Sequence, residues 1–242
     1  MLRDAQLMKS PLPISICLLG LLSGCECSSD QRQNPAVSPV VLGQLEVGLD
    51  VFDAHGRVRK VSISLRDRVE EALSKASNLE MGATESGGRG TPGRLRVHAK
   101  LSPDPTAGEL HGWAKARLDK TGLVPLSWDL DQREKMSQEV LTKLDESQLD
   151  ENLRTLVTKV IEALDRQVET VRLPEDRLMK ALARGDEVVA VAAASVLGRQ
   201  KSQEAADELC RALKRDETKV QQATLDALAK IGAQRSIGCV KS

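Results

Sequence analysis

The chain has 242 residues, and its 35 Lys and Arg residues balance its 35 Asp and Glu residues. With no net charge, there is no overall electrostatic field to attract nucleic acid or an acidic partner. Phe52, Trp113 and Trp128 are the only aromatic residues of the sequence. The stacking platforms that bind single-stranded nucleic acid are therefore missing, and nucleic acid is not an expected partner.

A short apolar stretch over residues 14–22 is followed by Ser23, Gly24 and Cys25. Its length fits the core of a signal peptide, about 7–15 residues, and falls short of the roughly 20 residues needed to cross a bilayer. The sequence Leu22-Ser23-Gly24-Cys25 resembles the lipobox of bacterial lipoprotein signal peptides. That resemblance implies a signal peptide over residues 1–24, cleavage before Cys25, and a lipid on Cys25 that anchors the protein to a membrane.

The same resemblance implies a location in the bacterial cell envelope. Glu26 stands where some inner-membrane lipoproteins carry Asp, so we expect the outer membrane, facing the periplasm. Asp4 fits poorly in the positively charged region that precedes a signal core, whereas a start at Met8 places Lys9 before the core. Met1 and Met8 are both candidate initiators.

Residues 25–40 follow this leader and connect it to the folded part of the chain. They are polar, include Pro35 and Pro39, and show no apolar periodicity, which predicts a flexible tether. A flexible segment of this length spans roughly 20 Å. The folded part would therefore stay close to the membrane and remain free to turn.

A small mixed α/β domain is predicted over residues 41–130. Residues 41–52 are apolar and β-prone, and residues 65–77 carry apolar residues at helical spacing. The Gly-rich residues 82–93 have the Gly-x-x-x-x-Gly spacing of a phosphate-binding loop, but Gly and Arg follow where Lys and Ser or Thr are required. We therefore expect a mobile loop there and no nucleotide cofactor.

An antiparallel hairpin is the clearest local pattern of this domain. Apolar and polar residues alternate along residues 94–101 and again along residues 110–118, which puts each set on one face of a sheet. The outward face is then conspicuously basic. Its residues are Arg94, Arg96, His98, Lys100, His111, Trp113, Lys115 and Arg117.

Two interpretations of this basic face are open. With the turn centred between residues 104 and 105, His98 faces His111 and Arg96 faces Trp113, so that Arg96 forms a cation–π pair. One interpretation is an anion site for a phosphorylated head group or an acidic glycan. The other, which we favour, is the solvated and normally charged face of an antiparallel sheet. Two histidines alone do not define a metal site, and no metal is expected.

Helical periodicity begins at residue 131, with helices predicted over residues 131–144 and 148–171. The second helix carries Leu and Val at three- and four-residue steps and would be about 36 Å long. We expect residues 131–173 to form connecting helices. The longer one would cap the repeats that follow and join them to the α/β domain.

Residues 174–242 repeat themselves at an offset of 31 residues, so that Val189 aligns with Val220. Each unit contains an apolar helix, an Asp turn and a helix rich in Ala and Leu. Residues 220–232 resemble the second helix of a bacterial HEAT-like repeat, and the resemblance implies a helical stack that binds other proteins. The Arg that usually follows the Val of these repeats is replaced by Ala190 and Gln221, so no side-chain ladder between repeats is expected.

Cys210 and Cys239 form a candidate disulfide. The repeat places both cysteines on first helices of neighbouring units, and an exported protein can keep disulfides. Packed helices lie about 8–10 Å apart, so the bond requires both side chains to face the shared groove. Pairing and non-pairing are both left open.

Catalytic motifs are absent from the sequence, including Gly-x-Ser-x-Gly, His-Glu-x-x-His and the dinucleotide-binding fingerprint. We therefore expect no catalytic residues, no cofactor and no enzymatic activity. The predicted fold class is α+β: a leader and tether, the α/β domain and the helical repeats. The expected function is a lipid-anchored envelope scaffold that binds another envelope protein through its repeats. The alternative is a module that binds an anionic glycan or lipid head group through the basic hairpin. The oligomeric state is left open.

Overall fold

The computed structural model describes residues 38–82, 92–120, 122–143 and 145–232 of the chain. The chain divides into two units, residues 1–37 and 38–242, and every described residue belongs to the second unit. The expected leader, lipid site at Cys25 and most of the tether therefore lie outside the described residues. The same is true of most of the expected Gly-rich loop.

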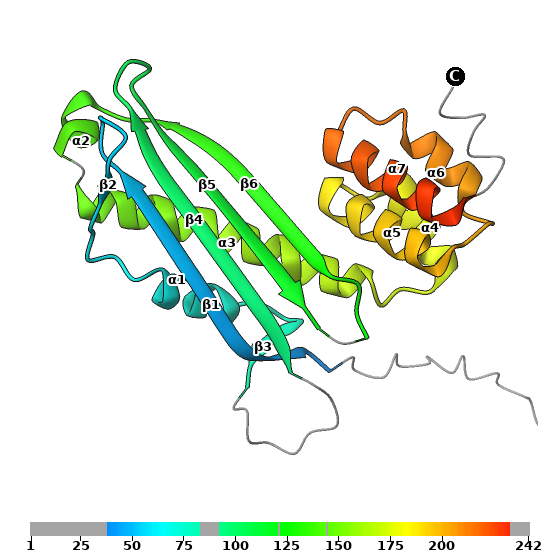
Figure 1. The fold of residues 1–242 in the computed structure, drawn as a ribbon. Helices are drawn as coiled ribbons and strands as arrows, with labels where there is room; N and C mark the ends of the chain where they lie inside the picture. Colours follow the sequence, from blue (N-terminus) through cyan, green and yellow to red (C-terminus); the bar gives the residue numbers. More distant parts are fainter. Residues whose placement is uncertain (1–37, 83–91, 121, 144, 233–242) are drawn as a thin grey trace, which may run out of the picture. The chain divides into compact units, whose positions relative to one another are not determined.

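A six-stranded sheet forms the first part of the described chain (Figure 1). Its strand order is β2-β1-β4-β5-β6, and β3 also pairs with β1. β4, β5 and β6 are antiparallel neighbours, whereas β1 runs parallel to both β3 and β4. The strands are β1 (Val40–Phe52), β2 (Val58–Arg59), β3 (Leu79–Met81), β4 (Gly93–Asp104), β5 (Glu109–Asp119) and β6 (Leu126–Lys135).

Two helices cover one face of this sheet, and the core lies between them and the strands (Figure 1). α1 (Leu65–Leu73) begins after Ser64, whose hydroxyl accepts the N–H of Asp67 at 3.3 Å. α3 (Glu146–Thr170) confirms the long helix predicted over residues 148–171. Its buried residues recur at three- and four-residue steps, and they pack on the alternate apolar residues of β4 and β5. The predicted combination of a mixed sheet domain and carboxy-terminal helices is confirmed.

The predicted hairpin is present as β4 and β5, but its predicted register is wrong. Lys100 lies opposite Trp113, and His98 lies opposite Lys115. Because the shift is even-numbered, the same residues stay on the same faces, and the basic side chains still point away from the core.

The register differs because the reversal comes later in the chain than predicted. β4 continues through Pro103 to Asp104, and residues 105–108 make the connection. The Asp104 carboxylate accepts the N–H groups of Thr106 and Ala107, both at 3.0 Å. Gly108 then adopts a φ of +66°, which few other residues tolerate. The Asp side chain, rather than the prolines, therefore sets the turn.

The helix predicted over residues 131–144 is wrong in its first part. β6 continues to Lys135, and α2 (Gln138–Lys143) begins only after it. Residues 131–135 are polar and largely exposed on both faces of the strand, so no alternation marks them as β-structure. The sheet consequently extends past the predicted domain boundary at residue 130.

Two helix pairs form the carboxy-terminal part of the described chain. The bounds of the two second helices differ by the predicted 31 residues, so the repeat is confirmed. The Asp186 carboxylate caps α5 by accepting the N–H of Val189 at 3.2 Å, and Gly232 ends α7 with a φ of +65°. The helices are α4 (Glu175–Arg184), α5 (Glu187–Gln200), α6 (Ala206–Ala212) and α7 (Thr218–Ile231).

The second helices of the two repeats approach each other very closely at Gly198. A Cβ atom added to Gly198 would lie 2.5 Å from the Cα of Ala227 and 2.8 Å from its Cβ. Small residues on both helices therefore permit backbone contact between α5 and α7. This explains why the helices are rich in Ala and why α5 is buried nearly all round.

The repeats are linked by a side chain, although no ladder was expected. Arg215, between α6 and α7, donates to the carbonyls of Leu182 and Gly185 at the end of α4, both at 2.9 Å. The same guanidinium binds Glu217 at 2.7 Å and lowers the pKa of that carboxyl. Arg215 thus satisfies carbonyls that the end of a helix leaves unpaired.

The long helix α3 contacts both parts of the described chain. Most of its buried side chains belong to the sheet core, while Val171 at its carboxy-terminal cap packs against the core of the repeats. Arg166 of α3 forms an ion pair with Asp186, the residue that caps α5. α3 therefore covers the first repeat, as the sequence predicts, and it also covers the sheet.

Candidate functional site

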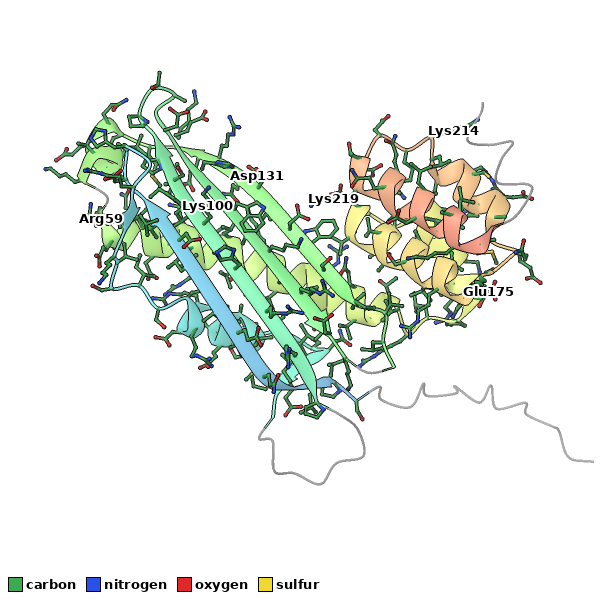
Figure 2. The ribbon with its side chains drawn as sticks, viewed as in Figure 1. Arg59, Lys100, Asp131, Glu175, Lys214 and Lys219 are labelled. Carbon is green, nitrogen blue, oxygen red and sulfur yellow. The ribbon has the colours of Figure 1, made fainter. Side chains whose placement is uncertain are left out.

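The sheet face opposite α1 and α3 carries all eight residues of the predicted basic face. Each of the eight is exposed or half-exposed, and alternate residues of β1 and β6 extend the same surface. We call this surface the open sheet face. From β1 and β6 it receives Glu46, Gly48, Asp50, Phe52, Ser127, Asp129, Asp131, Arg133 and Lys135, next to the residues of β4 and β5. Figure 2 labels Lys100 of β4 and Asp131 of β6 on this surface.

Carboxylates neutralise much of the basic character of the open sheet face. Arg96 and Arg117 lie directly opposite each other, and Asp119 binds them at 2.5 and 3.1 Å. The hydrogen bond from Arg96 is the main cause of a lowered pKa of the Asp119 carboxyl. Arg94 binds Gln44 at 2.6 Å and approaches Glu46 at 3.6 Å. The expectation of a conspicuously basic face is therefore corrected to a face of paired charges.

The two histidines of this face also have acidic partners. His98 Nε2 lies 3.0 Å from Asp50, and His111 Nε2 lies 2.7 Å from Asp131. The expected contact between the two histidines is wrong, because His98 and His111 lie on different rows of the sheet. No group of three or more His, Cys, Asp and Glu side chains in the described part of the chain could hold a metal ion.

The aromatic contacts differ from the predicted ones as well. Trp113 stacks edge-on against His98, with ring centroids 5.7 Å apart, and the expected cation–π pair with Arg96 is absent from the described contacts. The described cation–π pairs involve lysines instead. Lys100 lies 4.6 Å from the ring centroid of Phe52, and Lys219 of α7 lies 4.2 Å from that of Trp128.

A shallow depression of about 330 Å³ lies on the open sheet face beside Arg96 and Trp113. Gly48 forms part of it, and a Cβ at Gly48 would come within 3.0 Å of the His98 ring. Lys115 also lines it and makes no ion pair with any described residue. The depression is open and mostly bordered by paired charges, which favours a solvated surface over a specific anion site.

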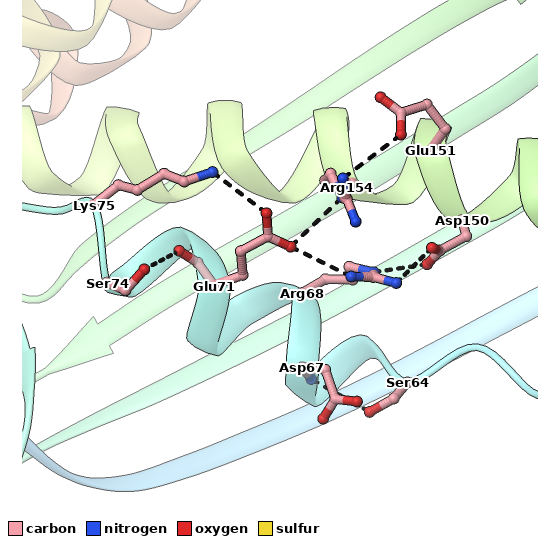
Figure 3. Close-up of polar contacts among 9 residues, drawn as sticks. All are labelled: Ser64, Asp67, Arg68, Glu71, Ser74, Lys75, Asp150, Glu151 and Arg154. Atoms are coloured by element: carbon pink, nitrogen blue, oxygen red, sulfur yellow. Dashed lines mark hydrogen bonds and ion pairs between the residues drawn. The ribbon is translucent and has the colours of Figure 1, made fainter.

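A second group of charges lies between α1 and α3 (Figure 3). Arg68 and Asp150 form a two-bond pair at 2.7 and 2.5 Å, and this hydrogen bonding raises the pKa of Arg68. Glu71 binds Arg68, Lys75 and Arg154 at 3.3, 3.4 and 3.5 Å. Every acidic group of the cluster already faces a cation, so we interpret it as a fastening of α1 onto α3 rather than a catalytic site.

A groove of about 590 Å³ lies between α4 and α6. Met179 and Ala183 supply its apolar part and lie one turn apart on α4. We call it the repeat groove. Its charged lining residues are Asp176, Lys180, Arg184, Glu208 and Arg211. These residues were not predicted from the sequence; the available signal was Met179, which is only half-buried, whereas Leu178 and Leu182 on the same helix are fully buried.

Cys210 lies on α6, the first helix of the second repeat, as predicted. It is disulfide-bonded. The other four cysteines, Cys239 among them, lie outside the described residues. The pairing of Cys210 with Cys239 therefore stays a prediction.

Comparisons with known proteins identify the repeats. Residues 175–241 match a family model described as HEAT repeats, and the carboxy-terminal segment thus consists of HEAT-like repeats. No curated protein matches the chain. A solved structure titled "Crystal structure of uncharacterized protein" aligns with 51% of this chain and 91% of its own, at 9% identity and a TM-score of 0.34. Within the described residues, no helix has the length and apolarity to span a membrane.

Proposed function

We propose that this protein is a scaffold whose HEAT-like repeats bind another protein, and that a lipid on Cys25 holds it at a membrane of the bacterial envelope. The observation that carries the proposal is the repeat groove, because it joins an apolar strip to a charged rim on the first helices of both repeats. HEAT-like repeats commonly serve as protein-interaction scaffolds. The proposed role requires no catalysis and no cofactor.

The lining of the repeat groove indicates the chemistry of its partner. Met179 has a flexible, polarisable side chain that adapts to different apolar partners. Arg211 and Glu208 form an ion pair at 2.9 Å, which leaves two cations, Lys180 and Arg184, against one carboxylate, Asp176, in the rest of the charged lining. A segment with one or two apolar side chains and acidic flanks fits this balance.

Site-specific photocrosslinking in intact cells tests the groove. A photoreactive residue at Ala183, inside the groove, should give a discrete protein adduct. The matched control is Ala229, an exposed alanine of α7 that does not line the groove. The Lys180→Glu and Arg184→Glu double variant should weaken the adduct. Equal adducts at Ala183 and Ala229, or none at Ala183, would contradict the proposal.

The lipid anchor is tested separately. Labelled fatty acid should enter the wild-type protein and not the Cys25→Ala variant, which lacks the acceptor thiol. The wild-type protein should fractionate with the outer membrane. Equal labelling of both proteins would remove the anchor from the proposal and leave the groove untouched.

A second candidate function is an anion-binding module on the open sheet face. The depression beside Arg96 and Trp113 favours this candidate, because Lys115 in its lining has no ion-pair partner among the described residues. Binding to anionic vesicles or acidic glycans that falls steeply with salt, and that is lost on replacing Arg96 and Lys115 by Gln, would support it. Retention of such a ligand without any protein adduct at Ala183 would promote it above the scaffold.

A further inference from the structure

The edge strand β6 has one side without a partner among the described strands. Among the described strands only β5 pairs with β6, which is the last strand of its sheet. Four of the five residues from Asp131 to Lys135 are exposed. Such an edge presents a row of backbone N–H and C=O groups to any strand of suitable sequence.

A contact from α7 shows which backbone groups of β6 point outward. Lys219 donates a hydrogen bond to the backbone carbonyl of Asp129, so this carbonyl points away from β5. Backbone groups alternate in direction along a strand. The N–H and C=O groups of Asp131, Arg133 and Lys135 therefore also face the open edge, where a second strand can bind them.

Charges along this edge follow a simple order. Asp129, Asp131, Arg133 and Lys135 alternate along β6 and share the open sheet face, with two acids before two bases. An antiparallel second copy centred on Gln132 would place its Arg133 opposite Asp131, while Asp129 stays paired with Lys219 of its own chain. The two-fold symmetry doubles the contact between Asp131 and Arg133 to two pairs of opposite charge.

We propose that two copies of the chain associate through antiparallel pairing of their β6 strands, centred on Gln132, to form one sheet across a two-fold axis. A protective edge that carries only one sign of charge would repel its own copy. Here the order of charges attracts the copy in one register. A slip by two residues places Asp131 against Asp131 or Arg133 against Arg133, which selects the register centred on Gln132.

Charge exchange tests the pairing. Sedimentation velocity of the full chain in mild detergent, over a range of concentrations, gives the dissociation constant of the dimer. Asp131→Arg and Arg133→Asp should each weaken the dimer by about tenfold or more, because each turns two attractive pairs into repulsive ones. The double variant restores opposite charges and should recover the wild-type constant within about threefold.

The control for charge exchange is Glu134→Lys, which changes charge on the same strand but on the other face. It should leave the dimer unchanged. Circular dichroism checks that each variant is folded, which matters for Asp131→Arg because Asp131 also binds His111. A chain that stays monomeric at every concentration, or a double variant no better than the single ones, would overturn the proposal.

A cysteine crosslink tests the register independently. The backbone groups of Gln132 point to β5, so Gln132 and its counterpart form a non-hydrogen-bonded pair with Cα atoms about 4.5 Å apart. That distance permits a disulfide. Gln132→Cys should therefore give an oxidised dimer that reducing agent separates. In the control Glu134→Cys, the counterpart lies about 13 Å along the strand and should not react. Equal crosslinking at both positions, or none at position 132, would exclude this register.

Discussion

The close contact of α5 and α7 makes Gly198→Ala a sharp test of how the repeats pack. The added methyl carbon would lie 2.5 Å from the Cα of Ala227, whereas ordinary contacts of a Cβ lie at 3.4–4 Å. The nearest atom belongs to a helix backbone and cannot rotate away. The two helices must therefore separate by about 1 Å, which loosens a well-packed core.

The expected cost follows from two opposing effects. Overpacking a core by one carbon costs about 1–3 kcal/mol. Replacing Gly by Ala inside a helix returns about 1 kcal/mol through helix propensity. Because the clash is with backbone, we expect overpacking near the upper end and a net loss of about 1–2 kcal/mol. For a chain of this size that lowers the melting temperature by about 2–8 °C.

Urea unfolding of the full chain measures this loss. Far-ultraviolet circular dichroism follows the helices, while fluorescence of Trp113 and Trp128 follows the sheet, because both tryptophans lie on its strands. Two controls calibrate the result. Ala229→Gly gives the helix-propensity cost at an exposed position of α7. Adding Ala227→Gly to the Gly198→Ala variant removes the 2.8 Å contact but not the 2.5 Å one. After subtraction of the helix-propensity cost measured at Ala229, it should restore only part of the stability.

The sign of the change in free energy of unfolding on Gly198→Ala tells whether α5 and α7 are in backbone contact. If helices α5 and α7 were not in backbone contact, Gly198→Ala would stabilise the protein by its propensity gain. A free energy of unfolding equal to or above that of the wild type would therefore refute the close approach.

The remaining predictions concern an acid-sensitive pair, the link between repeats and the disulfide. The pKa of Asp119 is lowered in the folded state, chiefly by its hydrogen bond from Arg96, so its contribution to stability is full above the ordinary Asp pKa and is lost as the pH falls through the folded value. Asp119→Asn should accordingly make the free energy of unfolding less dependent on pH in that acid range, as measured by urea unfolding; an unchanged slope would contradict this. Arg215→Met should cost about 1–3 kcal/mol, because it leaves carbonyls at the end of α4 without their charged donor, and a loss too small to measure would show that water replaces it. Peptide mapping without reduction should yield a Cys210–Cys239 linked peptide, and a link from Cys210 to another cysteine would exclude that pairing.

Local patterns predicted the elements that depend on nearby residues. The repeat offset of 31 residues is confirmed in α5 and α7, because apolar faces with Ala and left-handed carboxy-terminal caps, at Lys201 and Gly232, recur in both helices. The long helix α3 is also confirmed, because its apolar residues follow one helical stripe along all 25 residues, a pattern that the local sequence shows.

The errors arose where distant strands or solvent exposure decide the structure. Residues 131–135 form an edge strand exposed on both faces, so they lack the alternation that marks a half-buried strand. The hairpin register was wrong because the side chain of Asp104 moves the turn. The charge balance of the open sheet face was missed because Glu46 and Asp50 come from β1, whose parallel pairing with β4 no local pattern reveals.

The position of α3 determines at which end of the helical stack an additional helix pair can be accommodated. Its carboxy-terminal end and the ion pair from Arg166 to Asp186 close the side of the first repeat that faces the sheet. An extra helix pair inserted before α4 would have to displace α3 from both cores at once. One added after α7 would disturb neither core. Related proteins with longer stacks should therefore differ by insertions that follow α7, while the segment from α3 to α5 keeps its length.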